Sequence, residues 1–228
     1  MTNKIFIFGT GEIGELAHYY FTNDSDYQVV GFCCDDDFVR ETSFKQLPVV
    51  GVSDVNRVWS SSEFTAHVAL SYNKLNQTRK EKYFLLKSLG YVLPSYVCSK
   101  SVVWPDLKVG DNCFILENQT IQPTVSIGNN VMVWSGNHLG HRCIIGDHTY
   151  ISSHVCIAGH TVIGESCFLG VNACFKDFLL VGDSVFVGMG AVVTRNVETG
   201  SVVIGHSGQS FLVTDVEAIN LKKRYFDL

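Results

Sequence analysis

The sequence predicts a protein in two parts, a small parallel α/β domain followed by a triangular parallel β-helix. Three observations lead to this prediction. A glycine-rich turn joins the first buried strand to the first helix, an apolar residue recurs at every sixth position from Ser101 onward, and a short glycine-containing tetrapeptide returns every 18 residues. We expect the α/β domain at residues 1–98, the β-helix at 99–205 and a C-terminal tail at 206–228.

Composition narrows the class of protein. The 228 residues suffice for one large domain or two modest ones, and a chain of this length needs no disulfide or metal to stabilise its core. Hydrophobic residues make up 46% and charged residues 17%, which excludes disordered and collagen-like chains. The net charge of −5 argues against nucleic acid or an anionic membrane as the main partner. No apolar run is long enough to cross a bilayer and no export signal is evident, so we expect a cytoplasmic protein.

The eight cysteines are spread along the chain without a CxxC pair. This spacing argues against a zinc ribbon and against a thioredoxin-like redox motif. In a cytoplasmic protein we expect all eight to be reduced thiols.

The first strand and helix carry a candidate phosphate-binding turn. A buried strand at Ile5–Phe8 leads into Gly9, Gly11 and Gly14, a G-x-G-x-x-G motif that opens a helix. In this context backbone N–H groups at the helix N-terminus can bind a phosphate. The motif alone is a weak indicator of a dinucleotide.

Further elements alternate in the same way. We expect strands at Gln28–Cys34 and Val68–Ser71, and a helix at Asn76–Leu89 that ends before Gly90. Strand–helix alternation predicts a parallel sheet.

Acidic residues follow the second of these strands. Asp35 and Asp36 lie at its end, where a carboxylate can accept a hydrogen bond from a ribose hydroxyl or from a ring N–H of a base. The domain is short for a complete dinucleotide fold, which favours a nucleotide sugar. An NAD(P) reductase and a purely structural glycine loop remain alternatives.

The second half is a hexapeptide repeat. Written in blocks of six from Ser101, sixteen consecutive blocks have an apolar third residue. These residues are Val103, Val109, Ile115, Ile121, Ile127, Val133, Leu139, Ile145, Ile151, Ile157, Ile163, Leu169, Phe175, Val181, Val187 and Val193. Sixteen matches in succession indicate stacked strands with an apolar ladder inside.

A period of 18 lies on top of the period of six. The tetrapeptides VGDN, IGNN, IGDH, IGES and VGDS begin at Val109, Ile127, Ile145, Ile163 and Val181. Three hexapeptides therefore make one coil, and coils stack at ~4.8 Å through parallel strands. The Gly-Asp and Gly-Asn steps are expected at the corners, where residues that tolerate a left-handed backbone turn the chain.

Five histidines fall within residues 138–160, namely His138, His141, His148, His154 and His160. Adding one coil to 141 gives Gly159, so His141 and His160 are expected close together on one face. The alternative is that these histidines are ordinary polar turn residues. We predict no metal site, because no two of these histidines have the four-residue spacing of a metal-binding pair.

A short α/β domain followed by this prism, with HRCIIGD at 141–147, resembles the hexapeptide-repeat sugar-nucleotide acyltransferases. That family includes N-acetyltransferases of 4-amino-4,6-dideoxy sugars and relatives of the sialic acid O-acetyltransferases. The resemblance extends from GTGEIG to AVVTRN. It implies a Rossmann-like first domain, a left-handed β-helix, acetyl-CoA as co-substrate, and a homotrimer with active sites between subunits. The γ-class carbonic anhydrases share the prism, but their histidine spacing is missing here.

The same resemblance implies roles for individual residues. His141 corresponds to the catalytic base. The nucleotide is expected at the glycine motif and at Asp35 and Asp36, with Arg79 nearby as a basic contact or, alternatively, as a solvated helix charge. The residues expected near acetyl-CoA are Gly159, His160, Asn172, Gly188 and Gly190.

Two departures from the family pattern affect the site. Arg142 stands where some relatives have a glutamate that polarises the base, and Tyr150 stands where one relative has a second histidine. The group that orients His141 must therefore come from elsewhere, with Glu117, Asn118 and Asn137 as candidates.

These observations predict an enzyme. Acyl transfer to an amine requires that the two substrates are held together, that the amine loses a proton and that the oxyanion is stabilised. A direct ternary-complex mechanism needs no nucleophilic Ser or Cys. We therefore expect acetyl transfer from acetyl-CoA to the amine of a UDP- or dTDP-linked 4-amino-4,6-dideoxy sugar for surface polysaccharide or glycoprotein assembly. The alternatives are transfer to a sugar hydroxyl and a non-catalytic scaffold that binds a sugar nucleotide.

Overall fold

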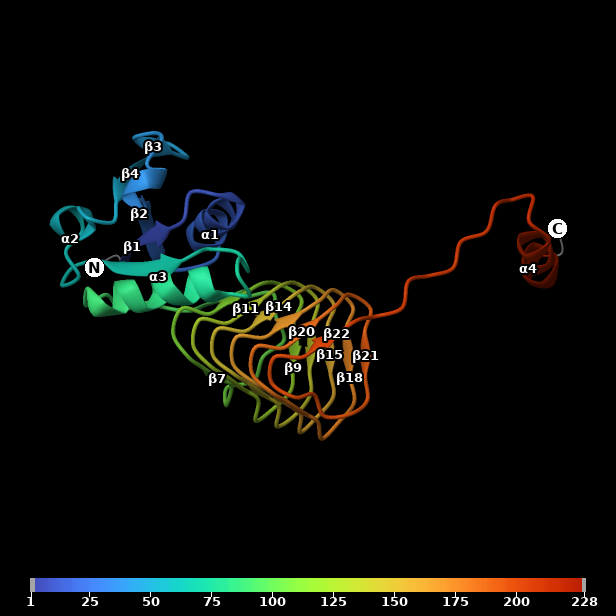
Figure 1. Ribbon diagram of the computed structural model, residues 1–228. Helices are drawn as coiled ribbons and strands as arrows, with labels where there is room; N and C mark the ends of the chain where they lie inside the picture. Colours follow the sequence, from blue (N-terminus) through green and yellow to red (C-terminus); the bar gives the residue numbers. More distant parts are fainter. Residues whose placement is uncertain (1–2, 227–228) are drawn as a thin grey trace.

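The structure, a computed structural model, describes residues 3–226 and shows an N-terminal α/β domain seated against one end of a long prism (Figure 1). The domain has a five-stranded sheet of order β3-β4-β2-β1-β5. Four strands are parallel, namely β1 (Asn3–Phe8), β2 (Tyr27–Cys34), β4 (Leu47–Gly51) and β5 (Thr65–Val68), and β3 (Ser43–Phe44) is antiparallel to β4. The helices of the domain are α1 (Glu12–Asn23), α2 (Val55–Val58) and α3 (Gln77–Ser88), with a 3-10 turn η1 (Asp36–Phe38).

The turn between β1 and α1 explains two glycines of the motif. Gly9 has φ +131°, a left-handed conformation that favours glycine, and a Cβ on Gly14 would lie 2.1 Å from the carbonyl oxygen of Gly9. Gly11 has open space around it and precedes the first residue of α1. The turn therefore packs tightly at Gly9 and Gly14 and leaves open space beside the α-carbon of Gly11.

The prediction of a strand at Val68–Ser71 is wrong in its bounds. The strand is β5, which pairs with Ile5–Phe8 of β1 and ends at Val68. Its partner β1 ends at Phe8, so residues beyond Val68 have no strand to pair with. The segment after Val68 instead passes close to the glycine turn, and the carbonyl oxygen of Ala69 would lie 2.4 Å from a Cβ on Gly9.

The prism has three parallel sheets, which we call the first, second and third faces. The first face contains β7 (Lys108–Val109), β10 (Ser126–Ile127), β13 (Ile144–Ile145), β16 (Val162–Ile163) and β19 (Leu180–Val181). The second face contains β6 (Tyr96–Val97), β8 (Phe114–Ile115), β11 (Met132–Val133), β14 (Tyr150–Ile151), β17 (Phe168–Leu169), β20 (Phe186–Val187) and β22 (Val202–Val203). The third face contains β9 (Thr120–Ile121), β12 (His138–Leu139), β15 (Cys156–Ile157), β18 (Cys174–Phe175) and β21 (Val192–Val193). Strands pair along each face with partners mostly 18 residues apart, as the repeat predicts.

The apolar third residues form the core of the prism. From Ile115 to Val193, every one is at most 3% exposed, whereas Val103, in the first coil, is 38% exposed. The ladder begins before the expected boundary at residue 98, because β6 at Tyr96–Val97 already pairs with β8.

The corners have a left-handed residue every six positions, and it is the fourth residue of the tetrapeptide rather than its glycine. Asn130 and His148 have φ of 55° and 62°. The glycine serves a different purpose, because a Cβ on Gly128 would lie 2.2 Å from Oδ1 of Asp147 on the next coil. Glycine is thus required for close stacking, and polar residues that tolerate positive φ make the turn.

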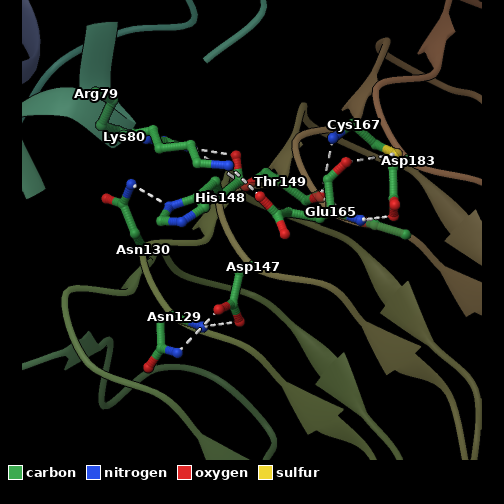
Figure 2. Close-up of polar contacts among 11 residues, drawn as sticks. Arg79, Lys80, Asn129, Asn130, Asp147, His148, Thr149, Glu165, Cys167 and Asp183 are labelled. Atoms are coloured by element: carbon green, nitrogen blue, oxygen red, sulfur yellow. Dashed lines mark hydrogen bonds and ion pairs between the residues drawn. The ribbon is translucent and has the colours of Figure 1, made fainter. Parts of the chain in front are cut away.

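The N-terminal domain sits on the second face. Phe21 of α1 packs with Phe114 and Tyr96, and Met132 and Tyr150 belong to the same buried cluster. Helix α3 lies along the edge between the first and second faces, where it is shown in contact with the prism in Figure 2.

Arg79 belongs to this domain junction. It is 3% exposed, and its Nη2 donates to the carbonyl oxygens of His148 at 3.0 Å and Thr149 at 3.3 Å (Figure 2). Burial lowers its pKa to about 10, so it stays charged at neutral pH. The neighbouring Lys80 forms an ion pair with Glu165. Arg79 is therefore a buried residue of the domain junction and not a solvated helix charge.

A ladder of buried polar side chains also joins the two domains. The N–H of Val68 donates to Oδ1 of Asn112 at 2.7 Å, and Nδ2 of Asn112 donates to Oδ1 of Asn130 at 2.8 Å. Nδ2 of Asn130 then faces Nδ1 of His148 at 2.9 Å (Figure 2). Because an amide nitrogen only donates, Nδ1 of His148 accepts, and the histidine is neutral.

Beyond the prism, an extended segment leads to α4 (Val216–Phe226), which lies away from the rest of the chain (Figure 1). None of the helices within residues 3–226 has the length and apolar character needed to span a membrane. All eight cysteines are free thiols, and only Cys156 and Cys174 are exposed.

Candidate active site

His141 lies at the corner between β12 and β13, on the edge between the third and first faces, which we call the His141 edge. Its side chain is exposed. Oε1 of Gln122, one coil earlier, accepts from the backbone N–H of His141 at 2.8 Å and lies 3.1 Å from Nδ1 of the ring. Both the backbone and the imidazole of His141 are thus held by one side chain.

The ring of His141 lies against Gly159 on the following coil. A Cβ on Gly159 would be 2.7 Å from Cε1 of the imidazole and 3.0 Å from Nδ1. Such distances are far below van der Waals contact, so only glycine leaves room for the ring in this orientation. The structure therefore brings together the two residues that the 18-residue period aligns.

His160 and Phe178 extend this arrangement along the His141 edge. The rings of His141 and His160 are 5.0 Å apart and nearly perpendicular, and His160 stacks on Phe178 at 4.5 Å. His160 and Phe178 are both left-handed corner residues, with φ of 62° and 58°. The expected proximity of His141 and His160 is present.

The other three histidines of the cluster lie at other corners or in a strand of the prism, and not on the His141 edge. His148 is 2% exposed, and burial lowers its pKa to about 4. His154 is a left-handed corner residue with φ 59°, and His138 lies in β12. His148 and His154 are thus both corner residues, of which His148 is buried and His154 is exposed.

Gln122 is a site residue that the sequence analysis missed. Of the three candidates for orienting His141, Glu117 accepts from the hydroxyls of Tyr20 at 2.6 Å and Ser135 at 2.7 Å. Asn137 is buried and its Oδ1 accepts from the N–H of Val155, and Asn118 is an exposed corner residue on a different edge. Gln122 lies 19 residues before His141, one position away from exact stacking, so the 18-residue period did not identify it.

A pocket lies beside the glycine turn. It has a volume of about 410 Å³ and is lined in part by Thr10, Gly11, Phe38, Arg40 and Phe44. Gly11 is at the N-terminus of α1, where free N–H groups favour an anion. An aromatic face, an arginine and a helix N-terminus together suit a nucleotide. Phe38 and Arg40 belong to no recognisable motif, so the sequence alone did not predict them.

The two aspartates after β2 have partners within the domain. Asp35 forms an ion pair with Lys82 of α3 at 2.6 Å. Oδ1 of Asp36 accepts from the hydroxyl of Ser53 at 3.0 Å and lies 3.3 Å from its N–H. Each carboxylate thus has one oxygen engaged in holding the loop after β2.

An aromatic groove runs along the second face. It has a volume of about 780 Å³, and its lining includes Tyr72, Trp134, Tyr150, Phe168 and Gly188. Tyr150 stacks on Phe168 at 5.4 Å, and Tyr72 packs against both rings. Tyr150 thus lies in this groove and not beside His141.

The residues expected near acetyl-CoA fall into two groups. Gly159 and His160 lie on the His141 edge. Asn172 and Gly190 are left-handed corner residues, with φ of 59° and 65°, on the edge between the second and third faces, where Gly188 lines the aromatic groove. One chain therefore does not bring all five together.

The prism also separates His141 from the pocket beside the glycine turn. The N-terminal domain and the aromatic groove are on the second face, and the His141 edge is the edge opposite that face. Within residues 3–226, no group of three His, Cys, Asp or Glu side chains is arranged to hold a metal ion.

Comparison with known proteins identifies the repeat and the fold. Residues 124–159 match the bacterial transferase hexapeptide family (six repeats). No curated protein matches the sequence. Among solved structures, PerB from Caulobacter crescentus in complex with CoA and GDP-perosamine superimposes with a TM-score of 0.80 at 21% identity, over 90% of this chain and 95% of that chain.

Two further structures have the same architecture. The acetyltransferase domain of PglB from Neisseria gonorrhoeae, in complex with acetyl coenzyme A, has a TM-score of 0.79 at 24% identity, over 92% of this chain and all of that chain. WeeI from Acinetobacter baumannii has a TM-score of 0.68 at 21% identity, over 90% and 97% of the two chains.

Residues 124–159 therefore match a hexapeptide-repeat family, and the chain has the fold of these structures, a left-handed parallel β-helix behind a Rossmann-like domain. The predicted fold class is confirmed over nearly the whole chain. It is the two-part fold of the PglB and PerB structures.

Proposed function

We propose that this protein transfers an acetyl group from acetyl-CoA to the amino group of a nucleotide-linked 4-amino-4,6-dideoxy sugar, with His141 as general base. The observation that carries the proposal is the position of His141, exposed at a prism edge and fixed by Gln122 and Gly159. Support comes from the similar structures, one solved with CoA and GDP-perosamine and another with acetyl coenzyme A.

In the proposed reaction, Nε2 of His141 accepts the proton that the sugar nitrogen loses as it attacks the thioester carbonyl. The tetrahedral intermediate carries its negative charge on oxygen, for which a backbone N–H of the next coil, such as that of Gly159, is a suitable donor. When the carbon–sulfur bond breaks, the CoA thiolate leaves and takes a proton from the imidazolium. A base of this kind contributes ~10²- to 10⁴-fold, and positioning of the two substrates contributes the larger share.

We propose that the nucleotide part of the acceptor, the nucleotide-linked amino sugar, binds in the pocket beside the glycine turn. Its diphosphate would lie at the N-terminus of α1 near Gly11, and Phe38 offers a face on which a base can stack. Gly9 and Gly14 keep the turn tight, and the free oxygens of Asp35 and Asp36 remain available to a base N–H. We propose uracil or thymine as the base, and guanine must be tested beside them because PerB was solved with GDP-perosamine.

The active site requires a second copy of the chain. A nucleotide sugar bound on the second face of one subunit can reach a His141 only if the opposite edge of another subunit lies against that face. Three such contacts close a cyclic trimer. Acetyl-CoA would lie between the subunits, along Gly159 and His160 of one and Asn172, Gly188 and Gly190 of the other. We place the enzyme in the cytoplasm, where both substrates are made, and in polysaccharide or glycoprotein assembly.

The test is release of CoA thiol from acetyl-CoA with UDP-, dTDP- and GDP-linked 4-amino-4,6-dideoxy sugars. We expect turnover with at least one of them, and at least a ~100-fold loss in His141→Ala. His18→Ala is the matched control and should keep full activity, because His18 is a histidine of α1 that lines neither the pocket beside the glycine turn nor the His141 edge. Equal activity of wild type and His141→Ala would exclude His141 as the base.

Absence of thiol release with every nucleotide amino sugar would favour the other candidates. Release with the corresponding 4-hydroxy sugars would indicate O-acetylation. A protein that is stabilised against heat by nucleotide sugars and unaffected by CoA would be a binding scaffold.

A further inference from the structure

Gln122 makes two contacts with His141 through one oxygen atom. Its Oε1 accepts from the backbone N–H at 2.8 Å and lies 3.1 Å from Nδ1 of the ring. Gln122 is located at the corner after β9, one coil before His141, and is only partly exposed. The contact therefore joins two coils of the prism at the proposed catalytic edge.

The backbone contact determines which way the amide of Gln122 points. A backbone N–H can only donate, so the atom that faces it must be the amide oxygen and not the nitrogen. The same oxygen also faces Nδ1 of the imidazole. An amide oxygen only accepts, so Nδ1 must carry the proton for this contact to be a hydrogen bond.

The tautomer of His141 follows from this pair of contacts. A neutral imidazole has a single N–H, and with that proton on Nδ1 the lone pair is on Nε2. Nε2 is the ring nitrogen that does not contact Gln122. Gln122 thus leaves the basic nitrogen free to meet a substrate.

We propose that Gln122 is the positioning residue of this site, one that fixes His141 in the Nδ1–H tautomer and so keeps Nε2 available to accept the proton of the sugar amine. The inference rests on the proposed function, because it assigns the reacting nitrogen of the proposed base. The residue adjacent to the base, Arg142, cannot accept a hydrogen bond from Nδ1, because a guanidinium only donates.

A neutral amide differs from a carboxylate in its effect on the base. A carboxylate at Nδ1 favours the charged imidazolium, whereas an amide orients the ring without adding a negative charge. His160, whose ring centroid is 5.0 Å from that of His141, and the adjacent, exposed Arg142 carry no negative charge. The carboxylate on the same edge is the exposed Asp177, two coils after His141.

The experiment compares wild type with Gln122→Met and Gln122→Glu in the full-length protein. Selective ¹⁵N-histidine labelling reports the tautomer of His141, and the resonance is assigned by its loss in His141→Asn. Gln122→Met keeps the length of the side chain and removes the acceptor, so we expect the ring proton to redistribute toward Nε2. We expect kcat to fall about 10- to 100-fold, with the KM of each substrate within about twofold.

Gln122→Glu serves as the conservative variant. It keeps an oxygen acceptor, so the Nδ1–H tautomer and much of kcat should be retained. The acidic limb of the pH–rate profile should move to higher pH by about one unit, because the carboxylate favours the imidazolium. Gln28→Met, on β2 far from the prism edge, controls for the loss of an amide and should match wild type in every measurement.

The outcomes separate this inference from the proposed function. An unchanged tautomer in Gln122→Met, or a change in KM without a change in kcat, would overturn the positioning role. If wild type releases no CoA thiol with any nucleotide amino sugar, the proposed function fails, and the tautomer measurement still decides whether Gln122 controls the ring.

Discussion

The imidazole of His141 lies against the α-carbon of Gly159, one coil further along the prism. A Cβ at position 159 would be 2.7 Å from Cε1 of the ring, so the orientation of the proposed base depends on the absence of a side chain there. Because the two residues are 18 apart, the same repeat that builds the core also places a glycine next to the histidine on the following coil.

Gly159→Ala should displace the ring without disrupting the prism. The methyl group would force His141 away from the next coil and strain its contact with Gln122, while the apolar ladder remains intact. We expect kcat for CoA thiol release to fall about 10- to 100-fold, with an unchanged circular dichroism spectrum. Gly208→Ala, where a Cβ has open space around it, is the control and should behave as wild type. Full activity of Gly159→Ala would show that the ring position seen here is not the working one.

The prism could be predicted in detail because its information is local and repeated. Each third residue of a hexapeptide must be apolar to enter the core, and Ile115 through Val193 satisfy this on coil after coil. The proximity of His141 and Gly159 follows by adding one coil. Nothing comparable marks Gln122, since a side chain that reaches a neighbouring corner at a spacing of 19 leaves no periodic trace.

The α/β domain was less predictable because its features depend on contacts between segments that are distant in the sequence. The end of β5 depends on where its partner β1 stops, which the local sequence of Val68–Ser71 does not show. The burial of Arg79 depends on the meeting of two domains, whereas its helix sequence looks like that of a solvated surface helix.

Arg79→Met should lower stability rather than nucleotide affinity. The substitution keeps an apolar stem at the junction but removes the donor to the carbonyl oxygens of His148 and Thr149. The carbonyl of Thr149 keeps the N–H of Met132 as a partner, so only the carbonyl of His148 is left without one. One buried carbonyl without a partner costs about 1–3 kcal/mol, so we expect the free energy of unfolding to fall by about 2 kcal/mol. Urea denaturation measures this loss.

Arg57→Met is the matched control, because Arg57 is an exposed arginine whose pairing with Asp54 contributes little. A raised KM for the nucleotide sugar in Arg79→Met, together with unchanged stability, would instead support a nucleotide contact.

The buried His148 predicts a loss of stability in mild acid. Burial lowers its pKa to about 4 from an unfolded value near 6.5, so the unfolded chain binds a proton before the folded chain does. The stabilising contribution is complete above about pH 6.5 and decreases as the pH falls toward 4. His67, which is also buried with a pKa lowered to about 4, acts in the same direction.

His148→Asn tests this contribution. Asparagine tolerates the left-handed backbone and can still contact Asn130, but it does not titrate. We expect the urea midpoint to change less between pH 7 and pH 5 in His148→Asn than in wild type. His154→Asn, at an exposed left-handed corner, should keep the wild-type pH dependence. The same steep dependence in His148→Asn would assign the effect to other groups.

If each active site combines residues of two subunits, trimers that contain both of two inactive variants should regain activity. His141→Ala removes the base from its edge, and Gly11→Phe fills the nucleotide pocket on the opposite side of the prism while keeping the extended backbone of Gly11 allowed. In trimers assembled at random from equal amounts, three quarters are mixed, and each mixed trimer has one site in three with both an intact His141 and an open pocket. Co-expression with two affinity tags should therefore yield about a quarter of wild-type thiol release, whereas separately purified variants stay inactive. Mixed trimers without activity would mean that base and pocket of one subunit serve the same site, against the separation of the His141 edge from the second face.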